Sequence, residues 1–548
     1  MIEGHKDNYF LYYVLNMYFF RVFFICFIMF FISCSDKNQA NYNIFRYNET
    51  SSITSLDPIF SNNQANIWAT NQIFNTLIEL DENLSPQPSV ANEWIVSENG
   101  LKYTFTLKNN IYYHYSPCFG IDSTRSLNAE DFIYSISRLQ DPNIISPGSW
   151  VLDYIDLPKT RALNDTTLEI CLNKPFPGIL GLLSMNYFSF IPFEAINYFG
   201  DSFSQNPIGT GPFSFKYWKQ NEKLLLVRNN NYFEFEDNNQ LPYLDGVAIS
   251  FITQKESVFM NFILGKFDFV SGLDNNFKDE FFSNKGDIID SYRDKFYVLS
   301  TPYLNTEYLG INIEKSKEVS NPLMLKNFRK AINYSFDRSV MTEHLRNGFV
   351  VPANKGFVPQ ILSECYDLNG FFYSPDSVYK LLSNIPDHNV EFTLNTTQDY
   401  LDICEFIQYS ASKFGININI EISSPAVHRD LFSTGAASFF RASWIADYPD
   451  PENFLSLFYS KNKSPFGPNY THFKNEKYDS LYLSSFYVND VDLRCDLFAQ
   501  MESILMEESN IIPLYYDYVV RLVSTNIQGM SINGMNSLSL KKVRKTHY

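Results

Sequence analysis

The stretch Pro207-Ile208-Gly209-Thr210-Gly211-Pro212-Phe213 is the most distinctive local pattern in this chain. Closely spaced glycines can form a loop that cradles phosphate, but such a loop needs a Lys followed by Ser or Thr, and none follows Pro212. We therefore predict a turn in which the glycines adopt positive φ and the proline fixes the start of the next strand.

Strand-like and helix-like runs alternate on both sides of this turn. Residues 224–227 form a short apolar run and residues 103–107 alternate with period two, so both predict strands. Asn128 predicts the N-cap of a helix that ends at Asp141-Pro142, and a second helix is expected from about residue 325 to 345. These runs indicate a mixed α/β protein.

Length and composition limit the classes of protein that are possible. A chain of 548 residues is too long for one compact core and suits two or three domains. Its hydrophobic fraction of 45% and aromatic fraction of 17% exclude a disordered or collagen-like chain. The formal net charge of -17 opposes binding to nucleic acid or to an anionic membrane surface.

The first 33 residues predict a secretory signal peptide. Residues 18–33 are almost wholly apolar, interrupted only by Arg21, and are too few for a comfortable membrane span. The run stops at Ser33-Cys34, where Cys34 is similar to the lipidated cysteine of a bacterial lipoprotein; an uncleaved anchor is the alternative. Met17 is a plausible true start, with Arg21 as the charged region.

The cysteines give no metal or redox motif. The chain has seven, none of them in a Cys-x-x-Cys pair, which disfavours zinc-ribbon and thioredoxin-like proteins. Removal of the signal peptide would leave Cys34 at the new N-terminus. The sequence leaves open whether the other five form disulfides; these are Cys118, Cys171, Cys365, Cys404 and Cys495.

Catalytic signatures are also missing from the sequence. The seven histidines are scattered, no His-Glu-x-x-His occurs, and no Gly-x-Ser-x-Gly marks a serine hydrolase. The acidic residues Asp447, Asp450 and Glu452 could suggest calcium, but prolines interrupt them and the glycine-turned loop of an EF-hand is missing. We expect neither an enzyme nor a metal site.

Five segments, taken in order, resemble the family-5 extracellular solute-binding proteins, which include the oligopeptide- and dipeptide-binding proteins. The stretch 207–213 is the most specific of them. The segments are Ser55–Pro58 with Ile73–Leu77; Ala91–Trp94, Tyr103–Leu107 and Asn128–Phe132; Pro207–Phe213 with Trp218 and Val227–Tyr232; Phe328–Arg338; and Arg441–Pro451 with Ile512–Tyr515.

This resemblance implies an α/β, two-lobed periplasmic-binding-protein-like fold of type II, which closes like a flytrap and carries an additional inserted domain. Two departures from the family pattern are His114-Tyr115-Ser116 and a local insertion from Cys118 to Arg125. The expected parts are a signal peptide (1–33), a lipidated tether (34–40), the first part of lobe I (41–84), an inserted domain II (85–200), the second part of lobe I (201–305), lobe II or domain III (306–510) and a return to lobe I (511–548).

The resemblance also implies which residues would hold a ligand. Asp447 matches the position that anchors the α-amino group of a bound peptide; its alternative is a turn aspartate. Ser443 and Ile445 match positions whose backbone pairs with the peptide. Arg441 matches an arginine that can meet the ligand carboxylate or form a structural ion pair, and Trp444 is either a pocket wall or core.

A second ligand-facing loop is expected at residues 61–64. Asn62 and Gln64 are its candidate site residues, and Asn62 stands where the family has an acidic residue. This substitution makes a charged role unavailable to Asn62.

The resemblance implies the extracytoplasmic substrate-binding component of an ABC importer. It would be a monomer that captures short peptides without a cofactor and presents them to permease subunits in the inner membrane. A lipid would anchor it in the periplasm or at the cell surface. The alternatives are a carrier of a nickel chelate or haem on the same fold, or a surface lipoprotein that captures peptides without import.

Overall fold

The computed structural model describes residues 42–272, 278–282, 288–318, 321–346, 349–383, 385 and 390–546. The expected signal peptide, the alternative start Met17 and the candidate lipidation site Cys34 lie outside these described residues. By its internal contacts the chain divides at Asn43, and the fold below is that of Ile44–Tyr548. Within the described ranges, every helix is too short or too polar to cross a membrane.

The Gly-Thr-Gly-Pro stretch leads into a four-stranded sheet. Its order is β1 (Ile44–Asn48), β12 (Gly246–Ser250), β9 (Lys223–Arg228) and β8 (Phe213–Lys219), with β1 and β12 parallel and the other pairs antiparallel. Helix α2 (Gln64–Ile73) packs against β8. The expected strand at 224–227 is therefore confirmed as part of β9.

The glycines of this stretch are needed for a reason other than the one we expected. Gly209 and Gly211 do not adopt positive φ. Instead, a Cβ atom at Gly209 would lie 2.2 Å from the carbonyl oxygen of Ile73, and one at Gly211 would lie 2.4 Å from the carbonyl carbon of Ile73. Only glycine lets this backbone approach the end of α2 so closely.

A second four-stranded sheet is wholly antiparallel. Its order is β4 (Ala91–Val96), β5 (Lys102–Leu107), β7 (Thr167–Cys171) and β6 (Arg161–Asn164). Strand β5 alternates between buried and more exposed residues, as expected. The expected helix is α3 (Ala129–Ser137), and Asn128 and Asp131 form a reciprocal capping box at its start.

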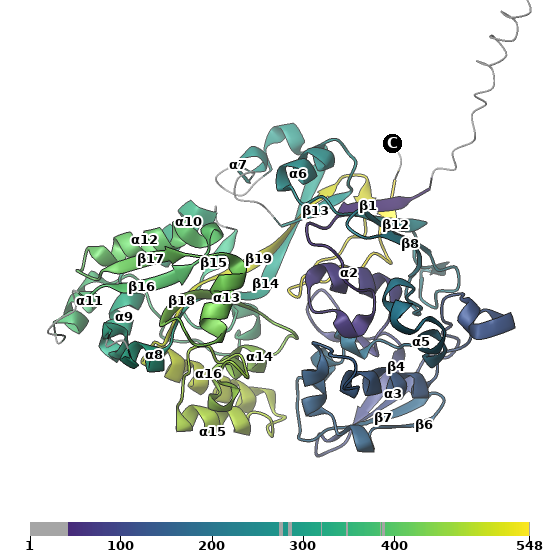
Figure 1. The fold of residues 1–548 in the computed structure, drawn as a ribbon, viewed down its shortest axis with the longest axis horizontal. Helices are drawn as coiled ribbons and strands as arrows, with labels where there is room; N and C mark the ends of the chain where they lie inside the picture. Colours follow the sequence, from purple (N-terminus) through teal and green to yellow (C-terminus); the bar gives the residue numbers. More distant parts are fainter. Residues whose placement is uncertain are drawn as a thin grey trace, which may run out of the picture. The chain divides into compact units, whose positions relative to one another are not determined.

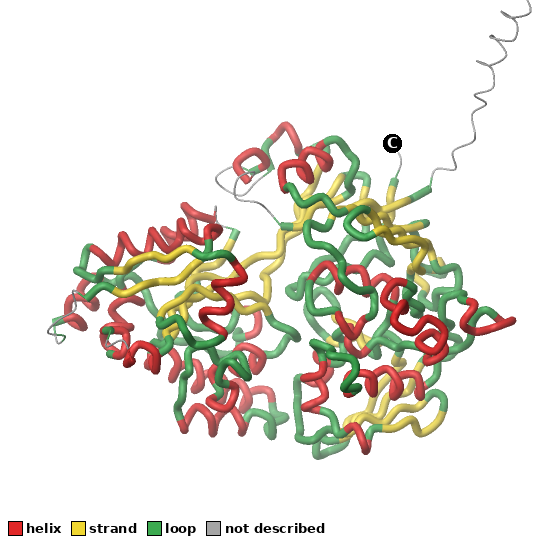
Figure 2. The backbone as a smooth tube through the Cα atoms, viewed as in Figure 1, coloured by secondary structure: helices red, strands yellow, loops and turns green. Residues whose placement is uncertain are grey.

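The largest sheet has seven strands. Its order is β13 (Phe269–Ser271), β19 (Ile511–Ser524), β14 (Phe296–Ile311), β18 (Phe439–Ile445), β16 (Phe392–Thr396) and β17 (Ile418–Ile422), and β15 (Val350–Pro352) also pairs with β19. Figure 1 shows the long strands β14 and β19 side by side, and Figure 2 shows helices flanking the strands of this sheet.

The two long strands contribute to three hydrophobic cores of the described residues. Near one end of the pair, Phe296 and Leu522 pack in a small core with the phenylalanines of α6 (Lys255–Ile263). Near the other end, Leu309 and Ile512 pack in a second core. Between these positions, Leu304 and Tyr308 of β14 belong to the largest core, so the long strands run through all three cores.

The helix expected from about residue 325 to 345 is two helices, so that prediction was wrong. They are α9 (Lys326–Tyr334) and α10 (Arg338–Arg346). The carboxylate of Asp337 accepts hydrogen bonds from the backbone N–H groups of Ser339 and Val340, and so starts a new helix. An aspartate at this position competes with continued helix formation because its side chain bonds to the backbone.

The remaining described helices and strands lie outside these three sheets. The helices are α4 (Ile179–Leu182), α5 (Phe193–Phe199), α7 (Lys278–Phe281), α8 (Ile313–Glu318), α11 (Pro375–Leu382), α12 (Leu401–Ser412), α13 (Pro425–Ser433), α14 (Pro451–Leu455), α15 (Glu476–Ser484) and α16 (Val491–Glu508). The strands are β2 (Ile78–Leu80), β3 (Pro86–Pro88), β10 (Phe235–Glu236), β11 (Asn239–Gln240), β20 (Ile527–Gln528) and β21 (Arg544–Lys545).

Candidate ligand-binding site

Strand β18 has one edge that is largely unpaired. On one side it pairs with β14 from Ile311↔Phe439 to Asn305↔Ile445. On the other side β16 meets it at a single pair, Asn395↔Phe440. Beyond Phe440, no strand in the described part of the chain covers this second edge.

The backbone of β18 presents its polar groups to that open edge. The N–H of Ala446 donates to the carbonyl of Leu304, on the β14 side. Because successive residues of a strand direct their N–H and C=O groups to opposite edges, Ser443 and Ile445 direct theirs away from β14. The two residues that we expected to pair with a ligand backbone therefore face the edge where an extended chain can be added.

Asp447 lies two residues beyond β18. Its side chain is reachable by solvent, yet protein atoms surround the carboxyl closely enough for lost hydration to raise its pKa to about 6. Within the described residues, no Lys, Arg or His forms an ion pair with it. An accessible carboxylate without a cation beside it can accept a cationic group of a ligand.

Asn453, in α14, holds the end of this strand in place. Its Oδ1 atom accepts hydrogen bonds from Trp444 Nε1 at 2.9 Å and from the backbone N–H of Asp447 at 3.2 Å. Trp444 is half-buried and packs against the largest hydrophobic core. One amide thus fixes both a candidate pocket wall and the candidate anchor. Sequence reasoning missed Asn453 because nothing local distinguishes it from any other helix residue.

Arg441 is occupied by contacts within the protein. Its Nη2 atom lies 2.6 Å from Oε2 of Glu307, and its guanidinium lies 3.2 Å from the ring centre of Tyr400. Its backbone carbonyl is 2.7 Å from Nε2 of His428. The sequence allowed two roles for Arg441, a structural ion pair or binding of the ligand carboxylate, and the contact with Glu307 is the structural ion pair. Glu307, which gives it a partner, was not among the expected site residues.

The two remaining candidates lie at the start of α2: Asn62 precedes the helix and Gln64 is its first residue. Asn62 and Gln64 are both exposed. Asn62 Oδ1 accepts from Nδ2 of Asn63 at 3.3 Å, and Gln64 Oε1 accepts from Nδ2 of Asn536 at 3.0 Å. Among the residues that the structure describes, no hydrogen bond or ion pair connects either side chain to β18, so their part in the site stays a prediction.

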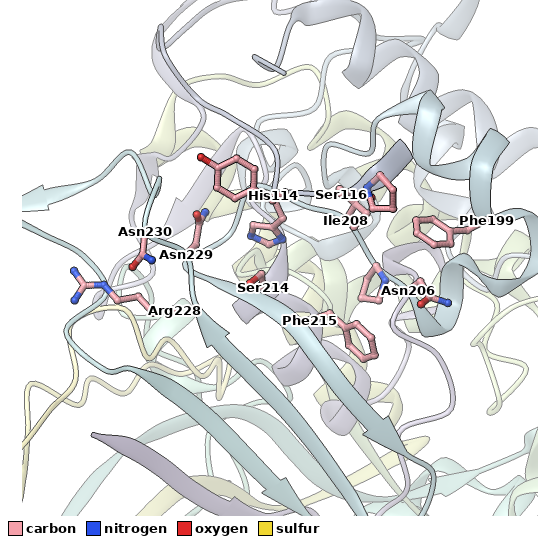
Figure 3. Close-up of a pocket in the computed structure, with 13 residues that line it drawn as sticks. His114, Ser116, Phe199, Asn206, Ile208, Ser214, Phe215, Arg228, Asn229 and Asn230 are labelled. Carbon is pink, nitrogen blue, oxygen red and sulfur yellow. The ribbon is translucent and has the colours of Figure 1, made fainter. Parts of the chain in front are cut away.

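A distinct cavity of about 240 Å³ lies beside the Gly-Thr-Gly-Pro stretch (Figure 3). His114 on its wall is buried, and its Nε2 atom lies 2.9 Å from the carbonyl oxygen of Gly211. Burial lowers the pKa of His114 to about 4, so the ring is neutral. None of the candidate site residues lines this cavity, and we do not assign the ligand to it.

The described residues bear on the calcium site that the acidic cluster could have suggested. They contain no group of three or more His, Cys, Asp or Glu side chains placed to hold an ion. Asp450 is instead paired with Arg494 at 2.8 Å, and Glu452 accepts from the hydroxyls of Tyr448 and Tyr482.

The fold, the free edge of β18 and the carboxylate of Asp447 without an ion pair are typical of a solute-binding protein. Residues 85–466 match the bacterial extracellular solute-binding proteins, family 5. The chain belongs to this family, and its mixed α/β architecture is the two-lobed fold of the periplasmic binding proteins.

Named relatives extend over most of the chain. The periplasmic oligopeptide-binding protein OppA of Salmonella typhimurium is 28% identical over 513 residues, which cover 88% of each chain. Heme-binding protein A of Haemophilus influenzae is 25% identical over 486 residues, 84% of each. The solved structure of the Escherichia coli murein tripeptide binding protein MppA covers 93% of this chain and 99% of its own, with 25% identity and a TM-score of 0.74.

Proposed function

We propose that this protein captures short peptides at the open edge of β18 and delivers them to the permease subunits of an ABC importer. The observation that carries this proposal is the accessible, unpaired carboxylate of Asp447 at the end of a strand with a free edge. The relatives named for peptide binding support it.

A peptide has the groups that this arrangement would recognise. Its ammonium group forms a charge-assisted hydrogen bond with the carboxylate of Asp447. Its backbone pairs with Ser443 and Ile445 as an added strand, and this part of the recognition does not depend on side-chain identity. The mechanism is reversible capture: the lobes close on the ligand, and the ligand's preference for the closed form limits the shift in population.

The location and the division into domains belong to the same proposal. Cys34 would carry the lipid that anchors the body outside the cytoplasm after the signal peptide is removed. The domain boundaries at residues 84, 200, 305 and 510 would separate the lobes and the inserted domain. The protein would act as a monomer and without a cofactor.

Native mass spectrometry of the full-length protein, purified in detergent without denaturation, tests the proposal. We expect co-purified peptides, and calorimetric titration with di- to pentapeptides should then show saturable binding without turnover. A haem or a metal chelate in place of peptide would contradict the peptide assignment, and peptide hydrolysis would contradict the carrier role.

We also predict that peptide affinity depends on pH through Asp447. Its pKa in the free protein is about 6. A bound ammonium group stabilises the ionised carboxylate. The peptide affinity therefore has its full value above this pKa and decreases as the pH falls below the pKa. Trialanine should bind about tenfold more weakly at pH 5 than at pH 7.5. Calorimetry at both pH values measures this, and Asp447→Asn should abolish the difference.

A further inference from the structure

A second carboxylate without a cationic partner lies close to β18. Asn305, on β14, is the cross-strand neighbour of Ile445. Its Nδ2 atom lies 3.3 Å from Oε1 of Glu307 and 3.5 Å from Oδ2 of Asp517, on β19. One amide therefore connects two acidic side chains next to the strand that we propose to hold the peptide.

The charges of these two acids are balanced differently. Glu307 is paired with Arg441, whereas Asp517 accepts from the backbone N–H of Tyr518 at 2.9 Å and forms no ion pair with any residue that the structure describes. Arg346 is the basic residue that most affects Asp517, but it is bound to Asp402 at 2.7 Å. Half-burial and the negative charge of Glu307 raise the pKa of Asp517 to about 6.

Asn305 supplies an independent indication that a ligand belongs here. Its side chain is buried, with 4% of the residue exposed, and its Oδ1 atom has no hydrogen-bond donor among the described residues. A buried acceptor without a donor is unfavourable. Next to a carboxylate that lacks a cation, this acceptor fits a ligand group that combines positive charge with several N–H donors.

We propose that Asn305 and Asp517 form a subsite for a lysine or arginine side chain of the bound peptide. This inference rests on the proposed peptide-binding function. An ammonium group offers three donors and a guanidinium five, enough to reach both the Asn305 carbonyl and the Asp517 carboxylate.

The two unpaired carboxylates then have separate roles. Asp447 follows Ile445 by two residues along the chain, and Asp517 is reached from Ile445 across the sheet through Asn305. Asp447 receives the terminal amine and Asp517 the side-chain cation. The net charge of -17 favours the encounter with such a ligand. Among short peptides, the protein therefore favours those that carry a basic side chain in addition to the terminal amine.

Calorimetric titration of the full-length protein in detergent tests this selectivity. The probes are tripeptides of alanine with one lysine at position 1, 2 or 3, and the matching peptides with norleucine, which has a similar apolar stem without the charge. For at least one position, the lysine peptide should bind about tenfold more tightly than its norleucine counterpart. In Asp517→Asn this ratio should fall towards one.

The matched control is Asp290→Asn, which changes an exposed aspartate outside the site. It should keep the wild-type ratio. Equal affinity of lysine and norleucine peptides at every position, or a ratio that survives Asp517→Asn, would overturn the subsite while leaving peptide binding intact. Failure of the wild type to bind any of the peptides would overturn the proposed function itself.

Discussion

Asp447→Asn should lower the affinity for trialanine about 100-fold. The substitution keeps the size of the side chain and the backbone bond to Asn453, but removes the only negative charge that we assign to the peptide amine. Loss of a charge-assisted hydrogen bond, with the ammonium left partly desolvated, costs about 2–3 kcal/mol, which corresponds to this factor. Titration calorimetry at pH 7.5 measures it.

Two controls separate recognition from misfolding. Asp430→Asn removes an exposed carboxylate on α13 and should bind as the wild type does. N-acetylated trialanine lacks the charged amine, so it should bind weakly and with similar affinity to the wild type and to Asp447→Asn. If the mutant retains wild-type affinity for free trialanine, Asp447 is not the anchor.

Replacing both Cys365 and Cys495 with serine should lower the free energy of unfolding by about 5 kcal/mol. The two residues form a disulfide across a sequence separation of 130 residues. A cross-link over so long a segment strongly restricts the unfolded chain, which is the main source of its stabilisation in the loop-entropy account. An extracytoplasmic protein meets the oxidising conditions that such a bond needs. Guanidinium denaturation measures the change.

The reducing agent dithiothreitol provides the matched control for this prediction. Reduction should destabilise the wild type to about the level of the double mutant, and it should leave the double mutant unchanged. The three other described cysteines, Cys118, Cys171 and Cys404, are free thiols. Equal stability of the wild type and the mutant under oxidising conditions would show that the cross-link contributes nothing.

The loop that holds Cys365 is fastened to α16 at a second point. Glu502 is buried in α16, seven residues after Cys495, and accepts hydrogen bonds from the backbone N–H of Val358 and the hydroxyl of Tyr366, both at 2.9 Å. Burial raises the pKa of Glu502 to about 7. Nothing in the sequence indicated the disulfide or the Glu502 hydrogen bonds, because both join segments that are far apart in the chain.

Short sequence patterns correctly predicted the features that depend on interactions between residues close together in the chain. The capping box at Asn128 and the alternation in β5 depend on residues within one or two turns or along one strand, and both are present. The expected single helix failed at Asp337, where a side chain bonds to the backbone and starts α10. The glycines at 209 and 211 were correctly singled out, but for the wrong reason, because the close approach of α2 is a tertiary contact.

By itself, the sequence determined the family, the two-lobed α/β fold and the motif that carries Asp447. The reason is that proteins with the same fold keep the same short motifs in the same order along the chain. Only the tertiary structure decided that Arg441 is neutralised by Glu307, 134 residues away, that Asn305 meets Asp517 across 212 residues, and that Cys365 pairs with Cys495. The physical reason is that ion pairs and cross-links depend on distances in space. The periodicity of a strand shows which face a side chain lies on, but it does not show which side chain of another strand will lie opposite.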